Sequence, residues 1–89
     1  MNVLIKNFGD VLTSRPSGKE AILMAESYVF NNLKDSEDIV LDFESVKVLS
    51  PSWFDEFFKG LKKSHSNNIS FLNTENSSVK ATLKTVLNK

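Results

Sequence analysis

The stretch Ile39-Val40-Leu41-Asp42-Phe43 decides the fold of this chain. It is a short, almost continuously apolar run, which is typical of a strand buried on both faces of an α/β sheet. Because side chains alternate along a strand, Leu41 points to one face and its neighbours Val40 and Asp42 point to the other. We therefore predict that this run is the central strand of the sheet.

Two amphipathic helices flank this run in the sequence. After it, Ser50-Pro51 has the form of an N-cap followed by a proline at the first helical position, and apolar residues at helical spacing continue to about Lys63. Before it, a second helix is predicted from about Lys19 to Leu33. Residues 14–18 are predicted to be a loop, because Pro16 biases the residue before it away from helical backbone angles.

Shorter elements complete the expected order. Asn2 to Phe8 is predicted as the first strand, and Val11 to Thr13 as a short second strand that forms a hairpin with it. Ile69 to Leu72 has the composition of a further strand. A last helix follows, with Asn76 or Ser77 as its N-cap.

The length and composition fit one small domain. The chain has 89 residues, of which 40% are hydrophobic and 25% charged, as in ordinary globular proteins. Together with the alternation of strands and helices, this predicts a single α/β domain over residues 1–89, with a mixed four-stranded sheet and about three helices. No apolar run approaches the ~20 residues of a membrane-spanning helix, so we expect a cytoplasmic protein without a membrane partner.

The chain has no cysteine, which excludes disulfides, thiol catalysis and Cys-based zinc sites. It also lacks a glycine-rich phosphate loop and a paired-histidine metal motif. The sole histidine, His65, lies in a polar stretch that we expect to be a solvated turn. We therefore expect no catalytic residue, no metal and no cofactor.

The zero net charge hides a split between the two halves. Residues 1–44 carry four basic and eight acidic residues, whereas residues 45–89 carry seven basic and three acidic ones. The basic second half raises nucleic-acid binding as an alternative. With one arginine in the chain and no recognition motif, these lysines fit solvated helix faces better, and we do not expect nucleic acid as a partner.

Four groups of residues, taken in order along the chain, carry a family resemblance. They are Phe8-Gly9 with Ser14-Arg15 and Gly18, Ile39 to Phe43 with Val46, Ser52-Trp53-Phe54-Asp55-Glu56-Phe57, and Asn73 with Ser78-Val79-Lys80. The set resembles the STAS-like family, small prokaryotic and phage domains of unknown function related to the STAS antagonists of anti-sigma factors. The resemblance implies a STAS-like fold and a regulatory protein-binding role. It also implies a partner of the histidine-kinase type, either an ATPase or an anti-sigma-type kinase.

The resemblance also bears on phosphorylation. STAS antagonists are switched off by phosphorylation of a serine at the start of the helix after the central strand. That position falls on Pro51 here, and Ser50 and Ser52 flank it as candidate phosphorylation sites. The residues themselves also allow a simpler role, in which Ser50 caps the helix and Ser52 fits its first turn.

We expect the docking surface for the partner at the start of this helix. Trp53 would be its aromatic anchor, if the ring is partly exposed rather than part of the core. Adjacent carboxylates and hydroxyls would supply the polar contacts. The predicted surface comprises Ser50, Ser52, Trp53, Asp55 and Glu56, and Arg15 is a further candidate for it.

A second candidate site, for a small anion or nucleotide, comprises Arg15, Ser17 and Gly18. Arg15 is the only arginine beside ten lysines, and a guanidinium offers a planar fork of donors to an anion. Its alternative role is an ion pair with a nearby acid such as Asp42. Asp42 itself needs hydrogen bonds if buried, and we expect it to anchor the loop that follows.

A third alternative is a self-assembling structural subunit. Leu23 and Phe30 lie seven residues apart on the predicted first helix, on the side away from its main apolar stripe. Such a second strip could pack on another copy of the chain. A homo-oligomer therefore stays open at this point.

Overall fold

Strand β3 (Ile39–Asp42) lies at the centre of the main sheet, as its apolar sequence predicts. The computed structural model describes residues 1–88 and pairs β3 in parallel with β1 (Asn2–Leu4) on one side and with β5 (Ile69–Leu72) on the other. Leu41 within β3 has no exposed surface. The central position of this strand is confirmed, whereas burial on both faces is not, because Val40 is only partly buried and its neighbours Asn2 and Ser70 are exposed.

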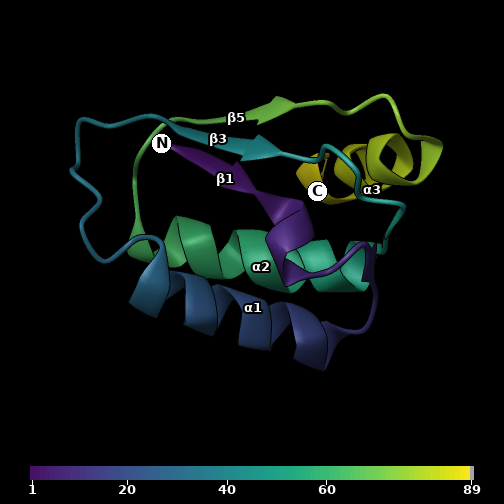
Figure 1. Cartoon of the computed structure of the whole chain (residues 1–89), viewed down its shortest axis with the longest axis horizontal. Helices are drawn as coiled ribbons and strands as arrows, with labels where there is room; N and C mark the ends of the chain where they lie inside the picture. The colour runs from purple at the N-terminus through teal and green to yellow at the C-terminus, as the bar shows by residue number, and fades with distance from the viewer. Residues whose placement is uncertain (89) are drawn as a thin grey trace.

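Helices α1 (Arg15–Tyr28) and α2 (Pro51–Ser64) lie side by side over one face of this sheet and run in the same direction (Figure 1). Leu41 is in register with Val3 of β1 and Phe71 of β5. These three side chains belong to or pack against the single apolar core. The helix pair therefore supplies the other half of that core.

A second, smaller sheet joins β2 (Val11–Leu12) to β4 (Val48–Leu49) in parallel. The 3₁₀-helix η1 (Ile5–Phe8) follows β1 directly and ends at Gly9, whose φ of 133° lies in the region that favours glycine. This helix separates the first two strands and sends β2 to a distant partner. The predicted hairpin of those two strands is therefore wrong.

The described part of the chain thus has five strands in two sheets of three and two, and every strand pair is parallel. The predicted mixed four-stranded sheet is wrong, whereas the α/β class and the three helices are confirmed. β4 is absent from the sequence prediction because a two-residue strand carries no periodicity. None of the helices within residues 1–88 is long and apolar enough to cross a membrane.

Helix α3 (Ser77–Leu87) is tied to β4 by hydrogen bonds. Asn76 is its N-cap, as predicted, and accepts the backbone N–H of Ser78 at 2.7 Å. The hydroxyls of Ser78 and Thr82 both donate to the carbonyl oxygen of Leu49. These bonds attach the last helix to the smaller sheet.

Helix α1 begins at Arg15 and ends at Tyr28, so it lies nearer the N-terminus than the predicted residues 19–33. Ser14 caps it and accepts a backbone N–H three residues later at 3.3 Å. Pro16 lies in the first turn, where its missing N–H costs no helical hydrogen bond. The helix can therefore include the segment that was expected to be a loop.

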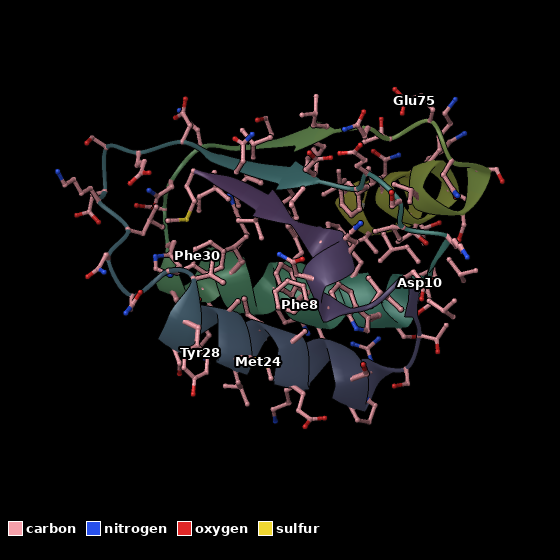
Figure 2. All side chains as sticks on the ribbon, in the orientation of Figure 1. Phe8, Asp10, Met24, Tyr28, Phe30 and Glu75 are labelled. Atoms are coloured by element: carbon pink, nitrogen blue, oxygen red, sulfur yellow. The ribbon has the colours of Figure 1, made fainter. Side chains whose placement is uncertain are left out.

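Beyond the end of α1 the chain turns inward, and Phe30 is only 3% exposed. The expected apolar strip of Leu23 and Phe30 is therefore wrong, because Phe30 is a core residue that does not lie on the helix. Leu23 itself is 59% exposed. Figure 2 shows Met24 and Tyr28 on the side of α1 that faces away from the sheet.

The N-terminal turns of α1 and α2 approach each other closely at Gly18. A Cβ atom on Gly18 would lie 2.3 Å from the carbonyl oxygen of Trp53. Because this neighbour is backbone, a side chain at position 18 could be accommodated only by moving the two helices apart. Glycine at this position therefore sets the spacing of the helix pair.

We predict that Gly18→Ala lowers the free energy of unfolding by about 2 kcal/mol, a typical cost of overpacking a core. The better helix propensity of alanine should not compensate for this loss. Gly60→Ala in α2 is the matched control. Its new Cβ would meet the buried side chain of Ile22 at 2.9 Å, which is a milder clash than the 2.3 Å approach to backbone at position 18. Urea denaturation should show the larger loss for Gly18→Ala, and equal stability of the two variants would contradict the account.

Candidate functional site

The N-terminal turns of α1 and α2 bring the two sets of predicted site residues together. Both helices begin at the end of the molecule where the strands of the main sheet end (Figure 1). Arg15, Ser17 and Gly18 come from α1. The other predicted site residues come from the N-cap and first two turns of α2. They are Ser50, Ser52, Trp53, Asp55 and Glu56.

Arg15 connects the two helices on the surface. Its Nη1 donates to Oδ2 of Asp55 at 2.9 Å and to Oε2 of Glu56 at 3.3 Å. The hydrogen bond that Arg15 donates to Asp55 is the main cause that raises the pKa of the Arg15 guanidinium above its ordinary value. The arginine side chain is 48% exposed, so this cluster presents both signs of charge to solvent.

The alternative role of Arg15, an ion pair with a nearby acid, is confirmed, but its partners are Asp55 and Glu56 and not Asp42. Asp42 is only 7% exposed. Its Oδ1 accepts the backbone N–H of Glu44 at 3.0 Å and the side-chain amide of Asn73 at 2.7 Å. Its predicted role as the anchor of the following loop is confirmed, because these bonds hold the segments after β3 and β5 together.

Trp53 is a core residue. Its side chain has no exposed surface and stacks on Phe57, with ring centroids 5.2 Å apart. Its one polar atom, Nε1, donates to the hydroxyl oxygen of Ser17 at 3.2 Å. The expectation that Trp53 is a partly exposed docking anchor is therefore wrong, and the ring supports the surface from beneath.

Ser50 is the N-cap of α2, as the sequence predicts. Its hydroxyl oxygen accepts the backbone N–H of Trp53 at 3.2 Å, and Pro51 occupies the first helical position. Ser52 lies half-buried in the first turn. Of the two candidate phosphorylation sites, only Ser50 has its hydroxyl oxygen engaged as the helix cap.

The groups predicted to bind a small anion are engaged within the protein. Arg15 pairs with two carboxylates, Ser17 accepts from the indole, and Gly18 packs on the backbone of Trp53. Carboxylates beside the guanidinium also oppose a second anion. This geometry favours a mixed-charge surface over an anion pocket.

A polar pair that the sequence reading missed joins the other ends of the same helices. Nε2 of His65 lies 2.9 Å from Oε2 of Glu26, and the imidazole packs against Phe30 at a ring distance of 5.5 Å. The expectation of a solvated turn at His65 is wrong, since its side chain is 18% exposed. Both residues lie near the C-terminal ends of their helices. Once the two helices are known to be parallel neighbours, this shared position predicts that the two side chains meet.

Within residues 1–88 no three His, Asp or Glu side chains gather in a way that could hold a metal ion.

A family model described as a STAS-like domain of unknown function (DUF4325) matches residues 27–79, which is more than half of the 89-residue chain. The matched segment runs from the end of α1 to the first turn of α3, so it includes the central strand and all of α2. Neither the comparison with curated proteins nor that with solved structures returned a match.

The burial of Trp53 generates a stability prediction. Trp53→Ala should lower the free energy of unfolding by about 3 to 5 kcal/mol, the usual cost of removing a buried aromatic side chain. Trp53→Phe keeps most of the buried ring and should lose less. The two variants can be compared by urea denaturation followed by circular dichroism, and a Trp53→Ala variant of native stability would mean that the ring lies at the surface.

Proposed function

The chain belongs to the family of STAS-like domains of unknown function, and we propose that it is a non-catalytic interaction module that regulates a partner protein. The partner class that we propose is an ATPase of the histidine-kinase type, or an anti-sigma-type kinase. The support for this class is the resemblance of the chain to STAS antagonists.

The observation that carries the proposal is the bridge of Arg15 to Asp55 and Glu56 over a buried tryptophan. A rigid apolar base beneath charged groups of both signs is an arrangement suited to recognising a protein surface, because charge complementarity orients partners and selects among them. We therefore revise the docking surface: Ser52, Asp55 and Glu56 remain in it, Arg15 joins it, and Trp53 supports it.

The proposal of a non-catalytic role rests on the local chemistry of the hydroxyls. A serine nucleophile needs a base that accepts its proton. In the described part of the chain the hydroxyl oxygens of Ser17 and Ser50 instead accept N–H groups, one from an indole and one from the backbone. These serines stabilise the helix ends.

Ser52 is the better candidate for regulation by phosphorylation. Ser50 would have to give up its cap to become phosphorylated, whereas the Ser52 hydroxyl has no such structural role. A phosphate on Ser52 would add negative charge three and four residues before Asp55 and Glu56, which lie on the same side of the helix. It would compete for Arg15 and repel an acidic partner.

We predict that a photo-crosslinking residue in place of Pro51, which is exposed at the start of α2, captures an ATPase or kinase of this class in the native host. The same residue in place of Glu75 is the control, since Glu75 lies on the far side of the molecule from α1 (Figure 2). The captured protein should then bind the purified wild type in isothermal titration calorimetry.

In that titration Glu56→Lys should weaken binding about ten-fold, equivalent to about 1.4 kcal/mol, whereas Glu75→Lys makes the same charge change elsewhere and should leave it unaltered. Circular dichroism would verify that both variants are folded. Unchanged affinity of a folded Glu56→Lys variant would remove this surface from the proposal.

The rival function, binding of a small anion or nucleotide, makes a different prediction. A ligand that binds only the native state raises its apparent stability, by about 2.7 kcal/mol at a concentration a hundred times its Kd. Because the anion-binding candidates are engaged internally, we expect no shift of the melting temperature with phosphate or nucleotides. A clear shift that Arg15→Gln abolishes would support the rival function instead.

A further inference from the structure

A second surface lies along the groove between α1 and α2, and it adjoins the start of α2 at Glu56. The groove has a volume of about 380 Å³ and is lined from both helices at helical spacing. Its lining residues extend over about two turns of each helix, residues 19–26 of α1 and 56–64 of α2, and the two helices lie side by side (Figure 1). Its shape suits a helix or an extended segment better than a compact small molecule.

The floor of the groove is apolar. Ile22 and Leu23 line it from α1, and Leu23 is largely exposed. Gly60 lines it from α2, and a Cβ there would lie 2.9 Å from Cγ1 of Ile22. The missing side chain at position 60 allows the close approach of the helices, and Ile22 packs directly on the backbone of α2 there.

The rim of the groove carries three lysines, Lys19 on one helix and Lys59 and Lys63 on the other. Lys59 and Lys63 are four residues apart and therefore lie one turn apart on the same side of α2. No ion pair within the described chain involves any of the three. Their charges are available to a partner.

The two carboxylates in the groove lining are already paired. Glu56 accepts from Arg15 at 3.3 Å, and Glu26 lies 2.9 Å from His65. The lining holds three lysines and two glutamates, and one of these glutamates, Glu56, is ion-paired to Arg15, so positive charge predominates in the groove. The surface therefore combines an apolar floor with a positively charged rim.

We propose that this groove binds an acidic amphipathic helix of a partner protein. Its apolar side chains would pack on Ile22 and Leu23, and its carboxylates would pair with the three lysines of the rim. A second copy of the chain fits less well, because an isologous contact would place lysine rim against lysine rim. Nucleic acid also fits less well, since the exposed Leu23 offers nothing to a phosphate backbone.

This proposal does not rest on docking at the start of α2. Either binding proposal can be contradicted by experiment while the other one stands. The probe for the groove is a short designed helical peptide with leucines on one face and glutamates on the other, labelled with a fluorophore. Two matched peptides replace the leucines by serine or the glutamates by lysine. Fluorescence anisotropy then measures binding to the full chain.

We expect the leucine–glutamate peptide to bind, and each altered peptide to bind at least about ten-fold more weakly, a difference of about 1.4 kcal/mol. Leu23→Ser should cause a similar loss in the protein. The double variant Lys59→Glu/Lys63→Glu should prefer the lysine peptide. Lys80→Glu/Lys84→Glu on α3 is the control, because it makes the same charge change on two exposed lysines four residues apart.

Amide chemical shifts of the wild type keep the test independent of how well the variants fold. The expected result is that the peptide perturbs residues 19–26 and 56–64 and leaves α3 unchanged. The proposal is overturned if the wild type does not bind the peptide, or if the shifts map elsewhere. It is also overturned if the serine peptide or a DNA duplex binds as tightly, or if the α3 control variant loses binding equally.

Discussion

The contact of Gly18 with the backbone of Trp53 is the constraint on which the rest of this structure depends. It lets α1 approach α2 closely enough for the indole N–H to reach the hydroxyl of Ser17, so that a large ring is buried with its polar atom satisfied. The same approach places Arg15 within reach of the carboxylates of α2. One glycine thus connects the core, the helix spacing and the charged surface.

The sequence could predict the elements whose evidence is local. β3 is a continuous apolar run, α2 begins with a serine cap and a proline, and both lie where expected. The pairing of β2 with β4 could not be predicted, because two-residue strands have no period and their partner is distant. The partners of Arg15 could not be predicted either, since they depend on how two helices pack and not on residues that neighbour Arg15 in the sequence.

Burial explains where the site prediction failed and where it held. An aromatic residue in a first helical turn can face the core or the solvent, and only the close approach at Gly18 shows that Trp53 faces inward. The polar residues around it remain at the surface.

The acidic and basic halves of the sequence meet at this surface: Arg15 comes from the acidic half, and Asp55 and Glu56 come from the basic one. The ion pairs of Arg15 therefore join the two halves of the sequence.

The central claim is that the Trp53 ring is locked between the two helices beneath the charged surface. Hydrogen exchange of its indole N–H measures this directly, and the chain has one tryptophan, so the NMR signal is unambiguous. The account predicts exchange only through global unfolding, with a protection free energy equal to that of urea denaturation. Rapid exchange, as in an exposed indole, would contradict it.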